Sequence, residues 1–563
     1  MGDFDYRRRV TNPVNVGGVM LGGDYPIRIQ SMTSTSTMDA DGSVEQCKRL
    51  AEAGAEYVRL TAQGVREAAN LDVIKSRLRA CGCNVPLVAD IHFNPKAAFE
   101  AARHVEKVRI NPGNFIDPGR TFKKLDFTDE EYAAEIKKIE SALVPFLDLC
   151  RENGTAIRIG VNHGSLSDRI MSRYGDTPQG MAESAMEFLR VCVAHDFNDV
   201  VISVKASNVS VMIETVRRLV AAMDAENMHF PLHLGVTEAG DGDDGRIKSA
   251  VGIGTLLAEG LGDTIRVSLS EDPVCEIPVA KMLVDYVATF ASAPEIPYGL
   301  SEGFNRLTPR RRESDAVGII GGTNRPVVLV EDGDGAYSGD EKPDAALADL
   351  KDYIEVDAAL LYDEWPAITP GKVVVMTSTS ANYPASVQGA LHKMISEGLT
   401  NPVILKASYA GVTPDEVTVR ASVDLGAPLM NGFVDGIMIE SDAMSTADAV
   451  KLAFGILQAT RLRITRTDYI ACPGCGRTLF DLQSTLKMVK SRTSHLKGLK
   501  IGVMGCIVNG PGEMADADYG YVGAGVGKVS LYKGKVCVEK NIPAGAEAVD
   551  RLLDLIKSDG NWK

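Results

Sequence analysis

The sequence lacks an apolar run of about 18 or more residues, the length that a membrane-spanning helix needs. Its first residues, MGDFDYRRRV, contain neither an apolar signal core nor an acid-free amphipathic leader. It also lacks a basic balance, because 60 lysines and arginines stand against 75 acidic residues and give a formal net charge of -15. We therefore expect a cytoplasmic protein with no membrane partner and no nucleic-acid partner.

Cysteine is also scarce, with 10 residues in 563, and most of these lie singly in apolar segments. This pattern excludes a secreted disulfide framework and indicates reduced thiols in a core. The 45% hydrophobic and 24% charged residues are typical of a globular chain and exclude a disordered or fibrous one. At about 100–200 residues per domain, the length predicts two to four domains.

Residues 26 to 295 alternate short β-branched segments with helical segments, a pattern typical of parallel α/β proteins. The β-branched segments number eight, which favours a TIM-like (β/α)8 barrel over the alternative, a doubly wound open sheet. We expect the strands within residues 26–32, 57–61, 86–93, 107–111, 156–162, 199–207, 230–240 and 264–270.

The rest of the chain divides into two further regions. From about residue 345 to 458 α/β segments resume, and two of them resemble barrel segments, VILKAS against VISVKAS and TSTS against QSMTSTST. These matches are so short that chance explains them as well as a degenerate repeat does. We expect a TIM-barrel domain at 1–298, an inserted α/β domain at 299–458 and a C-terminal domain at 459–563.

Charged side chains concentrate at the predicted carboxyl ends of the barrel strands, where barrel enzymes place their active sites. Four arginines and one lysine stand there against two acids, Asp90 and Glu238. Because an unpaired buried charge is costly, this set predicts an anionic ligand with more than one phosphate. The alternative is a set of structural ion pairs between strand ends and helix caps. The cations are Arg59, Arg109, Arg158, Lys205 and Arg266.

Three titratable side chains at these strand ends are candidates for proton transfer. Glu238 is the candidate general acid or base, and its alternative role is to pair with Lys205 or Arg266. His92 and His233 are weaker candidates, because a lone barrel histidine is more often a satisfied hydrogen-bonding residue.

Three cysteines near the C-terminus, unlike the other seven, form a pattern. Cys472 and Cys475 share a tight turn, Cys506 lies in a glycine-rich loop, and Glu513 follows seven residues later. Such thiolates are ligands for tetrahedral zinc or for a cubane iron–sulfur cluster. His495 is the candidate fourth zinc ligand, so zinc remains open, whereas the surrounding glycine amides favour a cluster.

These features occur together in one enzyme family. The segments PIRIQSMTSTST, PLVADIHF, RINPGN, SVKAS, PLHLGVTEAG, ACP-CGR and GC-VNGPGE closely resemble the 4-hydroxy-3-methylbut-2-enyl diphosphate synthase (GcpE or IspG) family. The resemblance covers nearly all of residues 5–300 and 460–563. It implies a substrate-binding barrel and a C-terminal α+β iron–sulfur domain resembling the cluster domains of sulfite and nitrite reductases.

The resemblance also implies an activity, a cofactor and residue roles. The activity is reductive ring opening and dehydroxylation of 2-C-methyl-D-erythritol 2,4-cyclodiphosphate in the methylerythritol phosphate (non-mevalonate) route to isoprenoids. Flavodoxin or ferredoxin would donate the electrons. A [4Fe-4S] cluster would be held by Cys472, Cys475, Cys506 and Glu513. The diphosphate would be bound by Arg59, Arg109, Arg158, Lys205, Arg266 and Ser268, and Asp90, Asn162 and Glu238 would lie near the reacting carbons.

The insert at 299–458 resembles the middle domain of the three-domain form of this family. It has no arginine set like that of the barrel, so we assign it a structural role. We hypothesise that it lets residues 460–563 fold back on the barrel of their own chain, in a monomer or a homodimer. The competing hypothesis for the whole protein is a zinc-stabilised barrel that binds a phosphorylated metabolite without redox chemistry.

Basic residues also accumulate between residues 461 and 500, where nine lysines and arginines stand against Asp468 and Asp481. A solvated helix face explains such a charge run. The functional hypothesis is a docking surface for an acidic flavodoxin or ferredoxin.

Overall fold

The computed structural model describes residues 3–116, 126–332, 337, 341–350, 352–360, 367–507, 510–514 and 516–562. The chain divides into two compact units. We call one the barrel unit, formed by residues 10–245, 262–280 and 466–563, and the other the middle unit, formed by residues 1–9, 246–261 and 281–465. Among the described helices, none combines the length and the hydrophobicity that crossing a membrane requires.

The barrel unit contains an eight-stranded parallel sheet with the order β8-β7-β6-β5-β4-β3-β10-β9. A parallel bridge between Ile202 and Leu232 joins the two end strands, so the sheet is nearly closed. The predicted eight-stranded barrel is therefore confirmed, and the doubly wound alternative is wrong. The strands are β3 (Arg28–Met32), β4 (Tyr57–Ala62), β5 (Leu87–Ile91), β6 (Lys107–Ile110), β7 (Ala156–Asn162), β8 (Val200–Lys205), β9 (His233–Leu234) and β10 (Thr264–Ile265).

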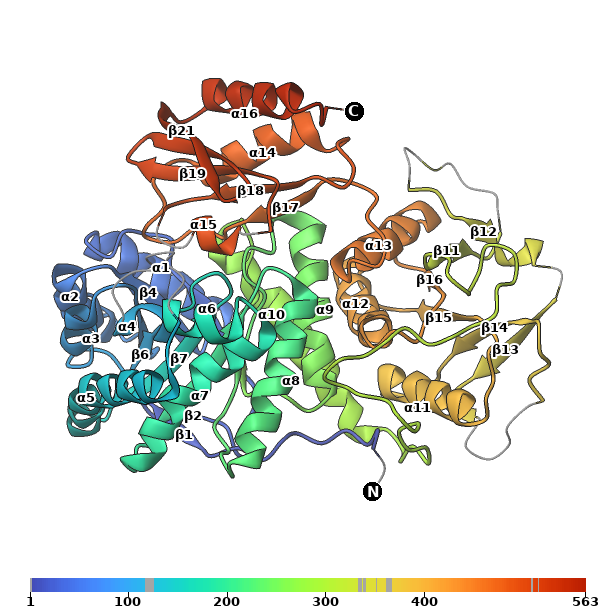
Figure 1. Ribbon diagram of the computed structural model, residues 1–563, viewed down its shortest axis with the longest axis horizontal. Coiled ribbons are helices and arrows are strands. Elements are labelled where there is room, and N and C mark those ends of the chain that lie inside the picture. Colours follow the sequence, from blue (N-terminus) through green and yellow to red (C-terminus); the bar gives the residue numbers. More distant parts are fainter. Residues whose placement is uncertain are drawn as a thin grey trace. The chain divides into compact units, whose positions relative to one another are not determined.

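Helices follow the strands and lie outside them (Figure 1). Their ends are set by local signals. Thr128 and Glu131 form a capping box before α5, and Gly54 ends α1 in the left-handed conformation. The helices are α1 (Ala40–Ala53), α2 (Val65–Ala80), α3 (Pro95–Ala101), α4 (Pro112–Phe115), α5 (Asp129–Asn153), α6 (Asp168–Tyr174), α7 (Pro178–Ala194), α8 (Val209–Ala225), α9 (Gly242–Ala258) and α10 (Glu276–Ala288), with 3-10 turns at Pro273–Cys275 and Thr289–Ser292.

An N-terminal hairpin, β1 (Val14–Val16) and β2 (Val19–Leu21), covers the amino ends of the barrel strands. Val14, Val16 and Leu21 are fully buried against Tyr57 and its neighbours at the strand starts. The sequence analysis did not predict this hairpin. It closes the barrel at the end opposite to the predicted site.

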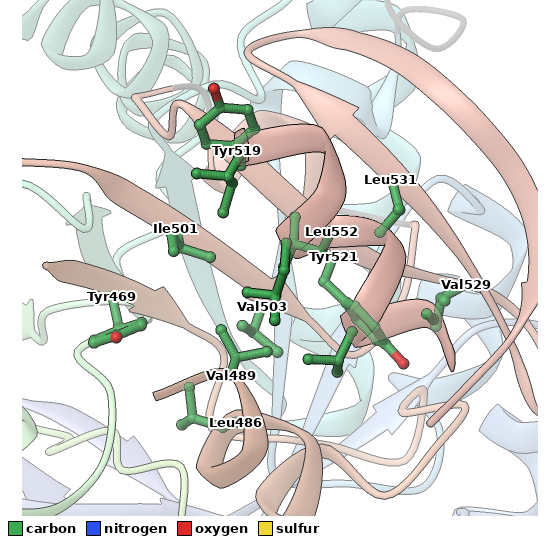
Figure 2. Close-up of a cluster of buried hydrophobic side chains, with 14 of the residues drawn as sticks. Tyr469, Leu486, Val489, Ile501, Val503, Tyr519, Tyr521, Val529, Leu531 and Leu552 are labelled. Carbon is green, nitrogen blue, oxygen red and sulfur yellow. The ribbon is translucent and has the colours of Figure 1, made fainter. Parts of the chain in front are cut away.

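The C-terminal part of the barrel unit is an α+β domain with a five-stranded mixed sheet. Its strands β17 (Asp468–Ala471), β18 (Lys500–Met504) and β19 (Tyr519–Gly525) are parallel, and β20 (Lys528–Lys533) and β21 (Val536–Pro543) add as antiparallel hairpins. Helices α14 (Leu482–Thr493) and α16 (Ala546–Ser558) share one apolar core with the sheet. Figure 2 shows this core, where Leu486 and Leu552 of the helices meet Val503 and Tyr521 of the strands. The short helix α15 (Gly510–Glu513) carries Glu513.

The middle unit holds a six-stranded parallel sheet with the order β12-β11-β16-β15-β14-β13. Lys406 of β15 occupies the position that Lys205 has in the short sequence match, but it lies in the middle of its strand, whereas Lys205 ends β8. The Nζ atom of Lys406 lies 3.0 Å from Glu331 and 3.1 Å from Glu440, so its charge is neutralised. The elements are β11 (Val327–Val330), β12 (Ala345–Ala346), β13 (Tyr353–Asp357), β14 (Val373–Thr377), β15 (Val403–Tyr409), β16 (Gly436–Ser441), α11 (Tyr383–Ser396), α12 (Pro414–Met430), α13 (Thr446–Ala459) and a 3-10 turn at Leu347–Asp349.

Candidate active site

The residues predicted to bind the substrate or the metal group, and those predicted to lie near the reacting carbons, line one cavity within the barrel unit. The carboxyl ends of the barrel strands form one wall, and the cysteine loops form the other. The barrel contributes Arg59, Asp90, Arg109, Arg158, Asn162, Lys205, Glu238, Arg266 and Ser268, and the C-terminal domain contributes Cys472, Cys475, Cys506 and Glu513.

Arg109 is the centre of a hydrogen-bond network that crosses the cavity. Its Nη1 lies 3.1 Å from Asp90 Oδ1, and its Nη2 donates to Asn162 Oδ1 at 2.8 Å. Because the amide oxygen of Asn162 accepts from Arg109, its NH2 group is turned outward and donates to Glu513 Oε1 at 2.7 Å. The network therefore joins the barrel interior to α15, and an amide at position 162 suits both of its neighbours.

Three cations of the cavity form no ion pair with an acid among the described residues. Arg59 donates to the thioether of Met32, at 2.9 and 3.1 Å, which is a weak acceptor. Arg158 has its Nε and Nη1 atoms buried without a partner. Lys205 is 5% exposed, and its ammonium group has no hydrogen bond or ion pair in the described chain. Burial lowers the pKa of all three groups, that of Arg59 to about 10. Such a set is stabilised when an anion enters.

The expectation that Asp90 and Glu238 alone balance the cations is wrong. Glu276, at the start of α10, accepts from Arg266 Nε at 3.1 Å and from Nη2 at 2.8 Å. Glu276 follows the β10 segment by several residues, so a search confined to strand ends missed it. The attraction of Glu276 raises the pKa of Arg266 against the effect of its burial.

Arg477 is a second residue that sequence reasoning did not place in the cavity. It is 9% exposed and lies 3.5 Å from Asp90 Oδ2, although it belongs to the loop after Cys475. The acids and thiols around it, with Cys475 and Asp90 foremost, raise its pKa. The motif CxxCGR is the sequence signal that could have predicted this position, because an arginine two residues after a candidate cysteine ligand must lie near the site.

The two histidines have different positions. His92 lines the cavity, and burial together with the neighbouring Arg109 lowers its pKa to about 3, so it is neutral. His233 starts β9 and does not line the cavity, and neither of its ring nitrogens has a hydrogen-bond partner. Neither histidine is positioned as a charged acid, in keeping with their weaker ranking.

Glu238 has the features of a functional carboxyl group. It adopts φ = 51°, a left-handed conformation that costs a non-glycine residue free energy, and its Oε2 is buried without a partner. Burial and the adjacent Glu513, which is within hydrogen-bond reach, raise the pKa of Glu238 well above its usual range. It is therefore protonated, and it can give up this proton inside the cavity.

Cys472, Cys475 and Cys506 line the same cavity, each partly exposed and free of any disulfide. Burial and the other two thiols raise the pKa of Cys472, and the Gly474 amide donates to its Sγ at 3.4 Å. Among the described residues, no three Cys, His, Asp or Glu side chains approach closely enough to bind a single ion. The three thiols and the Glu513 carboxylate line one cavity, and thiolates are the donors that iron–sulfur clusters use.

Backbone contacts hold the cysteine loops against the barrel. The Ala471 amide donates to Glu238 O at 3.3 Å, and Ser270 Oγ donates to Cys472 O at 2.9 Å. Gly164, after β7, approaches α15 so closely that an added Cβ would lie 2.1 Å from Gly512 O. Glycine at 164 is therefore a requirement of the docking of α15 on the barrel.

The basic segment 461–500 does not form one free cationic face. Acids from other parts of the chain neutralise five of its residues: Arg463 pairs with Asp344, Arg466 with Asp244, Arg477 with Asp90, Lys490 with Asp241 and Asp244, and Arg492 with Asp550. These partner acids lie outside residues 461–500, so the charge count within the segment did not predict the ion pairs.

Comparisons with known proteins agree with this arrangement. Residues 11–281 match the model of the GcpE TIM-barrel domain, and residues 468–558 match that of the GcpE protein C-terminal domain. The chain is 54% identical to 4-hydroxy-3-methylbut-2-en-1-yl diphosphate synthase (flavodoxin) of Bacteroides fragilis, with 100% of this chain and 97% of that protein covered. Proteins of the same name from Porphyromonas gingivalis (100% and 99% covered) and Leptospira interrogans (100% and 98% covered) are 50% and 41% identical to it.

Proposed function

The chain belongs to the GcpE family, and from this premise we propose that it reduces 2-C-methyl-D-erythritol 2,4-cyclodiphosphate to 4-hydroxy-3-methylbut-2-enyl diphosphate. The reaction consumes two electrons and two protons, opens the cyclic diphosphate and releases one hydroxyl group as water. The observation that carries the proposal is the cavity itself. Three cations that form no ion pair with an acid in the described chain line one cavity together with three thiols and a carboxylate.

The cations of the barrel mouth bind the diphosphate. Arg59, Arg158 and Lys205 have free donors, and a diphosphate supplies the acceptors that the protein does not. Arg266 and Arg109 are held by Glu276 and Asp90, so they add donors in fixed directions. Ser268 contributes a hydroxyl at the same rim.

A [4Fe-4S] cluster is the group that this donor set would hold, with Cys472, Cys475, Cys506 and Glu513 as its ligands. When bound, it would supply electrons one at a time and a Lewis-acidic iron whose carboxylate ligand would exchange more readily than a thiolate. Asn162 donates to Glu513 and orients its carboxylate.

Glu238 delivers a proton to the departing oxygen. It is held protonated by burial beside Glu513, and its position in the cavity puts it next to the bound substrate. Asp90 is different: the charges of Arg59 and Arg109 and a hydrogen bond with His92 keep its pKa well below its usual range despite its burial, so it stays ionised. It positions Arg109 and Arg477 and does not act as an acid.

The division into a substrate barrel at 1–298, a structural insert at 299–458 and a cluster domain at 459–563 is part of this proposal. So are a cytoplasmic location, which suits ten cysteines without a disulfide, and a monomer or homodimer. Flavodoxin, which is part of the relatives' names, is the proposed electron donor, and ferredoxin is the alternative carrier of the same class.

Turnover tests the proposal. Anaerobically prepared protein is supplied with the cyclodiphosphate and dithionite-reduced methyl viologen, and ³¹P NMR follows the loss of the cyclic diphosphate. We expect the linear allylic diphosphate to appear with wild-type protein and to fall by about two to four orders of magnitude with Glu238→Gln, as for loss of a positioned acid. Binding of the cyclodiphosphate without turnover in a zinc-containing protein would instead support the competing zinc hypothesis, for which the comparisons offer no support.

A further inference from the structure

We propose that the tip of the β19–β20 hairpin and Ile507, which directly follows Cys506, form the surface on which flavodoxin docks to deliver electrons. This inference rests on the proposed function, because an electron-entry surface has meaning only beside a redox group. We call the surface the hairpin patch and define it by Ile507, Val526 and Lys528.

The hairpin patch adjoins the cysteine loops on the side away from the barrel mouth. The amide of Gly527 donates to Leu479 O at 3.0 Å, and the amide of Leu479 donates to Gly505 O at 3.1 Å. A Cβ added at Gly523 would lie 2.3 Å from Gly505 O and 3.3 Å from Cys506 Cα. The hairpin therefore contacts both loops that carry the thiols, and Ile507 directly follows Cys506.

The opposite side of the cysteine loops is closed to a partner protein. There Gly476 packs on Thr35 and Thr61, and α15 packs on Gly164 of the barrel. A carrier must approach the thiols closely, and the hairpin contacts the loops that carry them.

The hairpin patch exposes apolar side chains beside a redox-type site. Val526 is 89% exposed and Ile507 is 52% exposed, whereas most valines and isoleucines of this unit are buried. Exposed apolar groups at a functional edge are typical of protein–protein contacts. A small apolar centre also suits the brief, weak encounters of redox partners.

Charge favours an acidic carrier at this place. The chain has a net charge of -15, yet residues 519–543 contain four lysines and one glutamate. The glutamate, Glu539, pairs with Arg551, and Lys533 pairs with Asp559. Lys528, which belongs to the hairpin patch, is exposed and has no ion pair within the described residues. It therefore offers an acidic flavodoxin a local attraction although the whole molecule repels it.

Matched variants at the two ends of β20 test the assignment. Val526→Glu and Lys528→Glu change the hairpin patch, and Lys535→Glu and Val536→Glu change the β20–β21 turn and the start of β21, about 20 Å away by strand geometry. Val536 is 66% exposed, so the control has a similar side chain in a similar setting. The full-length anaerobic enzyme is assayed once with reduced flavodoxin and once with dithionite-reduced methyl viologen. Titration calorimetry with oxidised flavodoxin measures binding without turnover.

We expect the hairpin-patch variants to raise the KM for flavodoxin and its Kd about tenfold together, with viologen-driven turnover unchanged and both controls near wild type. An unchanged Kd for flavodoxin, or an equal loss in the controls, overturns the inference. Loss of viologen-driven turnover in the hairpin-patch variants also overturns it, because these residues then support the site itself. Failure of the proposed function is distinct: the wild type then shows no turnover with viologen.

Discussion

At the scale of single residues, the arginines of the cavity fall into two groups: some have an acidic partner in the protein, and others have donors that only a ligand can satisfy. Arg266 is bound by the buried Glu276, which also accepts from Ser31 at 2.8 Å. Arg158 is 1% exposed, and two of its nitrogens have no partner. The same substitution at these two positions should therefore act on stability in opposite directions.

We expect Arg158→Met to raise the melting temperature of the ligand-free protein by a few degrees, because it removes a buried charge without a partner. Arg266→Met should lower stability by about 3–5 kcal/mol, because it leaves the Glu276 carboxylate buried alone. Scanning calorimetry without and with the cyclodiphosphate measures both effects, and both variants should lose most of the ligand-induced shift. Equal destabilisation by the two substitutions contradicts this account of the cations.

The sequence predicted these residues well because barrel topology places every strand end at one opening. It could not predict their ion-pair partners. Glu276 reaches the cavity from the start of a helix, and Arg477 reaches it from a loop nearly 400 residues after Asp90. The left-handed backbone of Glu238 was equally hidden, because no local pattern requires it.

At the scale of elements, the docking of α15 on the barrel depends on one glycine pair. Gly164→Ala should separate α15 from the β7 loop, because its Cβ would meet Gly512 O at 2.1 Å and its φ is +77°. We expect at least a tenfold loss of turnover, with binding of the cyclodiphosphate to the barrel retained. Gly154→Ala is the matched control: its φ is +63°, and no atom lies within 4 Å of the added Cβ. Comparable losses of activity in both variants would count against a specific docking role.

A second element-scale prediction concerns Asp424 of α12. This buried carboxyl group accepts from Tyr286 at 2.7 Å and from Tyr409 at 2.7 Å, and burial raises its pKa to about 7. The folded protein therefore keeps a proton that the unfolded chain loses near pH 4. The free energy of unfolding should fall as the pH rises from about 4 to 7, by up to about 4 kcal/mol, and stay level above pH 7.

Asp424→Asn removes this dependence. Urea unfolding of the wild type and the variant at pH 5, 6, 7 and 8 should show the variant gaining stability relative to the wild type as the pH rises. Parallel pH profiles for the two proteins would show that Asp424 is not protonated in the folded state.

The sequence predicted the barrel strands because short β-branched runs are typical of buried strands. It missed the β1–β2 hairpin, whose three-residue strands are too short to show a period. It also placed a cationic face on residues 461–500, because the acids that neutralise it lie elsewhere in the chain.

At the scale of the whole molecule, one chain supplies both walls of the cavity. Mixing a Glu238→Gln chain with a Cys506→Ser chain tests whether this is the working arrangement. We expect no recovery of turnover at any ratio, while each variant still binds the cyclodiphosphate. Recovery in the mixture would show that the cysteine loops of one subunit serve the barrel of another.

We conclude that the substrate whose diphosphate is held by the barrel cations contacts the metal group held by the thiols. The most direct test is the electron paramagnetic resonance spectrum of the reduced, iron-loaded protein before and after addition of the cyclodiphosphate. We predict about four irons per chain and a spectrum that changes on addition in the wild type but hardly at all in Arg158→Met. Full binding of the cyclodiphosphate by calorimetry with an unchanged spectrum would contradict the claim, because substrate and metal group would then occupy separate sites.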